Sequence, residues 1–251
     1  VTAAPRADKV TLLRRAYLDL TGLPPTLDEI DEFLSDTERG AWDRLVERLL
    51  ASPHYGERWG RHWMDIARYA DSTGFEQDYR RPNAWRYRDY VIDAFNKDKP
   101  YNQFLREQIA GDEVDHVTDE TLIATGFLRA GPRVQFREKD NPERRHDYLD
   151  DVLATIGRGV LGMTVHCARC HDHKFDPILQ KDYYSMQASI FGYVETDWPL
   201  LDLEDAKLYQ AANAVIDEQQ QPLRDQISTI EDPHRERLRI KMIKERFPEN
   251  V

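Results

Sequence analysis

Residues 142–177 have the sequence PERRHDYLDDVLATIGRGVLGMTVHCARCHDHKFDP, which carries the clearest evidence about the fold. Its first part places apolar residues at helical spacing and begins with Pro142, a residue typical of the first turn of a helix. The helical pattern continues almost to the cysteines, and a turn-rich segment then ends at Pro177. The stretch therefore predicts a long helix that leads into an irregular loop carrying Cys167 and Cys170, which are the two cysteines of the chain.

Helical patterns also occupy most of the rest of the chain. They cover residues 8–20, 27–34, 41–52, 57–72, 83–98, 101–113, 119–129 and 180–193. Thr26 precedes the second of these, and Glu29 follows it by three residues, as in a capping box. We find no convincing alternating strand pattern. The sequence therefore predicts an all-α fold, mostly helical, with irregular loops around residues 166–177.

A change of composition near residue 199 suggests two parts. We predict a helical domain over residues 1–198, which carries the cysteines, and a helical arm or hairpin over residues 199–251. The second part is polar, has aliphatic residues every three or four positions, and is interrupted by Pro222 and Pro233. It could pack on a partner or a neighbouring domain, or lie in solvent.

Composition limits the function. The chain has 251 residues, of which 40% are hydrophobic, so it can bury a core. A formal net charge of -11 argues against a nucleic-acid binder, which would present a basic surface. No apolar run is long enough to span a bilayer. Two cysteines cannot form a disulfide framework, so their spacing indicates attachment or ligation.

The pentapeptide CARCH, Cys167 to His171, has the pattern of a c-type haem attachment site. Two thiols separated by two residues can form thioethers with the two vinyl groups of one haem, and the next histidine can bind the iron. The motif lies late in a long helical chain. In the small cytochrome c fold it lies near the start, so we expect a different fold here.

Two other interpretations of the same residues stay open. A structural zinc site needs four ligands, usually as two separated pairs, whereas Cys167, Cys170, His171 and His173 are crowded into seven residues. A redox-active dithiol would be expected in a βαβ setting, which the sequence lacks. We therefore favour haem over zinc, and zinc over a dithiol.

A second iron ligand is less clearly marked. His62 is the candidate distal ligand, because Trp59 and Trp63 on the same helix could enclose a cofactor, although it could equally be an ordinary surface histidine. Met163 is an alternative thioether ligand. His173 is too close to His171 in sequence to reach the opposite face of the iron easily, so we place it in the surroundings of the ligands or as an alternative ligand.

Two acidic residues of the loop are candidates for the surroundings of the ligands. Asp172 and Asp176 could accept hydrogen bonds from backbone amides or from the proximal imidazole, or could belong to a plain turn.

Five stretches together resemble a known family, the planctomycete cytochrome-c-associated domain of unknown function. They are LRRAYLDLTGLPPT, ERWGRHWMDIARYADS, WRYRDYVIDAFNKDKPYNQFLREQIAGDE, ATGFLRAGP and LGMTVHCARCHDHKFDPILQKDYY. The resemblance implies one covalent haem c on Cys167 and Cys170, with His171 as an axial ligand, and places His62 and His173 on the family pattern. It also implies export and neighbouring domains in a longer polypeptide. It implies no particular activity, because the family itself is uncharacterised.

The sequence leaves three functions open. The first is an electron-transfer domain with a six-coordinate haem that serves a redox partner or neighbouring domains, in the periplasm or at the cell surface; this is our expectation. The second is a haem enzyme with an open distal position, near Tyr69, Asp71, Arg80 and Arg86. The third, a zinc-binding structural or interaction module, applies only without haem.

Overall fold

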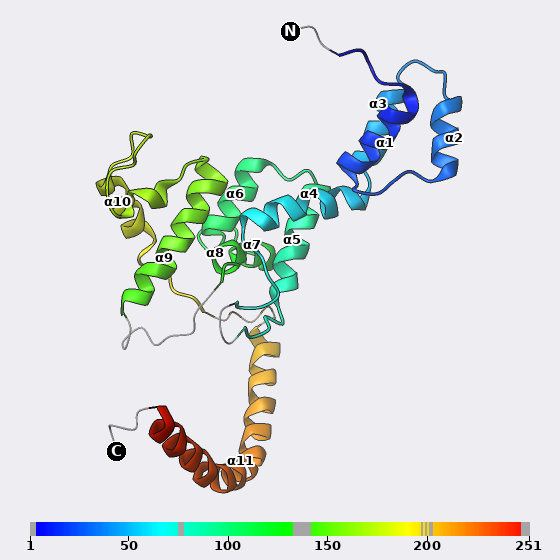
Figure 1. Cartoon of the computed structure of the whole chain (residues 1–251). Helices are drawn as coiled ribbons and strands as arrows, with labels where there is room; N and C mark the ends of the chain where they lie inside the picture. The colour runs from blue at the N-terminus through cyan, green and yellow to red at the C-terminus, as the bar shows by residue number, and fades with distance from the viewer. Residues whose placement is uncertain are drawn as a thin grey trace. The chain divides into compact units, whose positions relative to one another are not determined.

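The computed structural model describes residues 4–74, 78–132, 142–196, 198, 200 and 203–246. The chain divides into two compact units, Val1–Glu195 and Thr196–Val251, and each is described separately (Figure 1). Across the described residues the regular structure is helical, without a strand, apart from one isolated bridge between Ser72 and Arg80. The all-α prediction is confirmed.

The first unit begins with a small group of three helices. These are α1 (Lys9–Leu20), α2 (Leu27–Ser35) and α3 (Ala41–Leu50). They bury an apolar cluster that includes Leu13, Phe33 and Leu45. The predicted capping box is present at α2, where Thr26 Oγ1 accepts the Glu29 N–H at 3.3 Å and the Glu29 carboxylate accepts the Thr26 N–H at 2.7 Å.

Five further helices supply most of the largest core of the unit. These are α4 (Pro53–Ile66), α5 (Ala84–Asn96), α6 (Tyr101–Ala110), α7 (Asp119–Ala124) and α8 (Gly126–Arg129). Trp63 is buried in this core, whereas Trp59 and Ile66 are 38% and 42% exposed. The reason is that α4 turns Gly56, Gly60 and Trp63 inward, one and two turns apart, and this places Trp59 and Ile66 on another face. The helix ends at Ile66, earlier than predicted.

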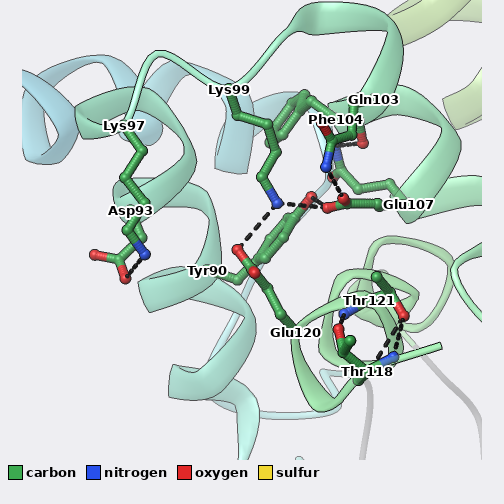
Figure 2. Close-up of polar contacts among 11 residues, drawn as sticks. Tyr90, Asp93, Lys97, Lys99, Gln103, Phe104, Glu107, Thr118, Glu120 and Thr121 are labelled. Carbon is green, nitrogen blue, oxygen red and sulfur yellow. Dashed lines mark hydrogen bonds and ion pairs between the residues drawn. The ribbon is translucent and has the colours of Figure 1, made fainter. Parts of the chain in front are cut away.

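A polar cluster is buried among α5, α6 and α7, and we call it the Glu107 cluster (Figure 2). The side chains of Lys99 and Glu107 are only 9% and 5% exposed, and their charged atoms are 2.6 Å apart. Tyr90 Oη and Gln103 Nε2 also donate to Glu107, at 2.8 and 2.7 Å, and Lys99 reaches Glu120 at 3.0 Å. Burial raises the pKa of Glu107, but these hydrogen bonds outweigh it and hold that pKa below its usual value. The cluster is therefore a satisfied network that joins three helices.

The last part of the first unit carries the cysteines. It consists of α9 (Pro142–Ile156), the π-helix η1 (Gly157–Leu161), the 3₁₀-helix η2 (Val165–Arg169) and α10 (Gln180–Ile190). The predicted helix over 142–162 is present, but its last turn widens into η1 and stops at Gly162, which has a φ of +64°.

The second unit contains α11 (Leu203–Arg246), which has 44 residues. The prediction that Pro222 and Pro233 interrupt this part is wrong, because the helix continues through both and bends along its length (Figure 1). Across Pro222, Gln221 Nε2 donates to Asp225 at 2.8 Å and Arg224 donates to Gln220 at 2.9 Å. None of the helices in the described part of the chain is long and apolar enough to cross a membrane.

Candidate functional site

The short helix η2, which carries the first cysteine, packs against α9 and α10 through two buried side chains. Val165 and Ala168 of η2 are 2% and 0% exposed, and they pack in a small core with Leu153 of α9 and Tyr183 of α10. Because successive residues of a 3₁₀-helix point about 120° apart, burial of Ala168 turns its neighbours away from the core. The loop is therefore seated on α9 and α10, with its other side chains directed outward or sideways.

Arg169, which lies between the cysteines, holds the loop to α9. Its guanidinium donates to Asp147 at 2.8 Å and to Asp150 at 3.1 Å, two carboxylates one helical turn apart. The hydrogen bond to Asp147 and the charge of Asp150 raise the pKa of Arg169 above its usual value. Asp150 also accepts from Tyr183 Oη at 2.7 Å, which links the same carboxylate to α10.

The carbonyl group of Arg169 is bound as well. It accepts from Gln180 Nε2 and from Tyr184 Oη, each at 3.1 Å, and both donors belong to α10. Both ends of this residue are therefore fixed, the side chain to α9 and the backbone to α10.

The two thiols lie on the surface, one on each side of Ala168 and Arg169 in the sequence. Cys167 and Cys170 are both exposed, and both are free thiols. Cys167 Sγ lies 3.9 Å from His166 Nε2, which in turn lies 3.3 Å from an Arg158 nitrogen. Cys167 and Cys170 are therefore two exposed cysteines three positions apart on an anchored backbone, without a disulfide between them.

His171 follows the second thiol and is exposed. Its Nδ1 lies 2.7 Å from the backbone carbonyl oxygen of Asp172. A carbonyl oxygen can only accept, so Nδ1 carries the proton and donates. The lone pair of the neutral ring is then on Nε2, the nitrogen that a metal would bind.

His173 has a different role from His171, although the sequence made it an alternative ligand. Its side chain is only 7% exposed. Its Nδ1 accepts the backbone N–H groups of Phe175 and Asp176, at 3.3 and 2.9 Å, and its Nε2 lies 2.9 Å from Thr164 Oγ1. Both ring nitrogens therefore serve the loop itself, and the ring closes the turn that follows His171.

The two acidic residues of the loop also differ from each other. Asp172 Oδ1 accepts the N–H of Gln180 at 2.8 Å and so satisfies a free amide at the start of α10. Asp176 is half-exposed, and its carboxylate lies 3.4 Å from His173 Nδ1. The acceptor beside the His171 ring is the backbone of Asp172 and neither of these carboxylates.

The candidate distal residues lie on elements that meet at η1. Met163 is 39% exposed and its N–H donates to the Gly157 carbonyl at 2.9 Å. Gly159 of η1 lies against Ile66 of α4, so closely that a Cβ on Gly159 would be 2.6 Å from Ile66 Cγ2. His62 lies one turn before Ile66, is exposed, and its ring centre is 5.5 Å from that of Trp59.

The residues named for a haem enzyme are engaged in local contacts. Tyr69 Oη donates to Asp71 at 2.7 Å, and burial together with this hydrogen bond raises the pKa of Tyr69 to about 12. The Arg86 guanidinium lies 4.8 Å from the centre of the Trp85 ring, and Arg80 pairs with Ser72 through the backbone. For zinc, the described residues contain no group of three or more histidine, cysteine or acidic side chains arranged around a common point.

The sequence did not reveal the residues that seat the loop. Asp147, Asp150, Tyr183 and Thr164 are part of the site through contacts with Arg169 and His173. A usable signal was present in Asp147 and Asp150, since acidic residues three apart lie on one helix face. It could not be linked to Arg169 without knowing that η2 folds back on α9.

Fold and loop together define an all-α domain with a CxxCH loop exposed on its surface. The family model PSCyt2, described as a protein of unknown function (DUF1549), matches residues 1–195. This range covers more than half of the chain, which therefore belongs to that family, and it coincides with the first unit. Neither a curated protein nor a solved structure matches the chain.

Proposed function

We propose that the first unit is a c-type haem domain that transfers electrons to or from a partner protein or a neighbouring domain. The observation that carries the proposal is the loop: two exposed free thiols flank a buried alanine and a fixed arginine, and His171 follows with Nε2 available. Cys167 and Cys170 would hold the haem covalently, and His171 would bind the iron. When bound, the haem would supply an iron that alternates between the ferric and ferrous states and carries one electron.

The proposed attachment of haem needs no reactant other than the haem and the thiols of Cys167 and Cys170. Cys167 and Cys170 would each add across one vinyl group of the haem, so that an S–C bond would form at one vinyl carbon and the thiol hydrogen would pass to the other. No oxidant or reductant would be consumed, but both cysteines would have to be thiols, and no disulfide joins Cys167 to Cys170. Such attachment takes place on the outer side of the bacterial inner membrane, so the proposal includes a periplasmic or cell-surface location.

The second axial position separates the electron-transfer proposal from a haem enzyme. A strong sixth ligand favours electron transfer, and an open position favours catalysis. His62 and Met163 are the candidates, because the helix that carries His62 packs on η1 and Met163 follows η1 by two residues.

The test is to express the chain with the bacterial haem-attachment machinery and stain a denaturing gel for covalent haem. We expect haem on the wild-type protein and none on Cys167→Ser/Cys170→Ser. His171→Ala is expected to change the ferric and ferrous spectra, whereas the matched change His54→Ala, at another exposed histidine, leaves them unaltered. A competent maturation that yields no covalent haem would refute the proposal, and zinc would then be sought by metal analysis.

The sixth ligand is read from the same samples. Sharp low-spin bands that are lost in His62→Ala or in Met163→Ala would identify the ligand. High-spin bands that shift with carbon monoxide would move the proposal to the enzyme.

A further inference from the structure

An apolar stripe runs along α11 in the second unit. It consists of Tyr209, Ala212, Ile216, Leu223, Ile227 and Ile230. At 100° per residue these positions fall on one face of the helix. The five larger side chains are between 48% and 68% exposed. Exposed apolar residues aligned over this length indicate a surface that another chain covers.

The spacing of the stripe is the same from either end. The intervals between successive members are 3, 4, 7, 4 and 3 residues, and the centre falls between Gln219 and Gln220. An interface between two identical helices related by a two-fold axis requires this property, since each residue must meet its counterpart reciprocally. We propose that two copies of the chain pair through α11, antiparallel, with the two-fold axis at Gln219 and Gln220.

This register matches apolar residues along the whole stripe. Tyr209 of one copy faces Ile230 of the other, Ala212 faces Ile227, and Ile216 faces Leu223. The pattern extends by four residues at each end, to Asp205 and His234, which face each other as an acid and an imidazole. The inference concerns the second unit and is independent of haem binding in the first.

Charge favours the antiparallel orientation. In this register Glu204 is matched with Arg235 of the other copy, and Lys207 is matched with Asp232. Parallel pairing would instead match each of these residues with its own counterpart of like charge.

The two halves of the stripe cannot meet within one copy. The helix is continuous through its centre, where side-chain hydrogen bonds join Gln220 to Arg224 and Gln221 to Asp225. At a rise of about 1.5 Å per residue, Ile216 and Leu223 are roughly 10 Å apart along the axis, and Tyr209 and Ile230 roughly 32 Å. The matching half is therefore not supplied by the same helix, and in this proposal a second copy of the chain supplies it.

The first experiment is sedimentation equilibrium of the full chain over a range of protein concentrations. We expect the mass to rise from 29.5 kDa towards twice that value. Ile216→Glu is expected to raise the dimer dissociation constant about 100-fold, because it buries two unpaired carboxylates at the interface. The control is Val215→Glu, which alters a neighbouring β-branched residue, 55% exposed but about 100° away around the helix.

The second experiment fixes the orientation. A photoreactive benzoylphenylalanine replaces Tyr209, and the cross-linked dimer is digested with trypsin. Linkage to peptide 225–235 of the other copy, which contains Ile230, is expected. Linkage to peptide 208–224 of the other copy would indicate parallel helices and overturn the register. A monomer at every concentration, a cross-link within one copy, or equal effects of the two glutamate variants would overturn the proposal.

Discussion

The Glu107 cluster and the CxxCH loop are both polar and both anchored, but their reactive atoms point in opposite directions. In the Glu107 cluster, the charged atoms of Glu107 and Lys99 turn inward and bind one another (Figure 2). In the loop, Ala168 and Arg169 turn inward, while both thiols and the His171 ring face solvent. The first arrangement stabilises the fold, and the second presents atoms that the fold itself does not use. The comparison predicts that substitutions in the Glu107 cluster lower the free energy of unfolding, whereas substitutions of the two cysteines abolish only the proposed haem attachment.

The largest effect on stability is expected from Glu107→Ala. It leaves the buried Lys99 ammonium without its closest carboxylate, so the free energy of unfolding should fall by about 3 kcal/mol. Urea unfolding followed by circular dichroism measures the change. Glu107→Gln keeps the shape and the acceptor for Tyr90 and should cost less. A loss below about 1 kcal/mol would show that the cluster does not differ from surface ion pairs.

The same cluster predicts a dependence on pH. The pKa of Glu107 is lower in the folded protein than its usual value of 4.5, so its contribution is present above that value and is lost as the pH falls through the folded pKa. The stability difference between wild type and Glu107→Gln should therefore narrow from pH 7 to pH 3. Urea midpoints of the two proteins at several pH values test this, and a constant difference would contradict it.

The pKa of Lys99 is shifted in the opposite direction to that of Glu107. Burial lowers its pKa, but the hydrogen bonds to Glu107 and Glu120 outweigh burial and raise the pKa above its usual value of 10.5. Its contribution is thus present below that value and is lost as the pH rises through the folded pKa. The contribution of this cluster to the free energy of unfolding is therefore expected to be greatest between the usual pKa values of Glu107, 4.5, and Lys99, 10.5.

A smaller effect is expected from Arg169→Ala, which removes the anchor of the loop. Because this side chain is 35% exposed, we expect a loss of only about 1 kcal/mol, with faster hydrogen exchange at residues 165–170. Lys181→Ala, at an exposed position of α10, serves as the control and should change neither quantity. Unchanged exchange in Arg169→Ala would mean that the apolar contacts of Val165 and Ala168 alone seat the loop.

The smallest effect on stability is expected from Cys167→Ser/Cys170→Ser in haem-free protein. Both side chains are exposed, so the free energy of unfolding should change by no more than about 0.5 kcal/mol, although the substitution removes the proposed sites of haem attachment. Thermal unfolding of the haem-free proteins measures it. A loss above about 1 kcal/mol would show that the thiols are part of the packing, and the contrast between the two regions would fail.

Local features of the fold could be predicted from the sequence, since they depend on neighbours within a few residues. The helices followed from apolar spacing, and the Thr26–Glu29 capping box from two residue types. The exposure of Trp59 and Ile66 could not be foreseen, because it depends on Gly56 and Gly60 bringing α4 close to α5. The continuity of α11 through Pro222 was missed because proline usually ends a helix.

In the candidate site, too, features that depend on nearby residues could be predicted, and features that depend on distant contacts could not. Cys167, Cys170 and His171 were recognisable from spacing alone. The distinct role of His173 was not, since it depends on Thr164 and on two backbone amides that the turn brings together. Nor was the link from Arg169 to Asp147 and Asp150, which spans about twenty residues of sequence.

The exposure of the two thiols also has a consequence for handling the protein. A thiol at the surface is open to peroxide and to air, and it passes through sulfenic acid to forms that no longer add to a vinyl group. Under the proposed haem attachment, polypeptide that has not yet received haem would be open to damage at Cys167 and Cys170 until the thioethers form. Purification of the haem-free chain calls for reductant throughout, and the age of a sample becomes a variable in any attachment assay.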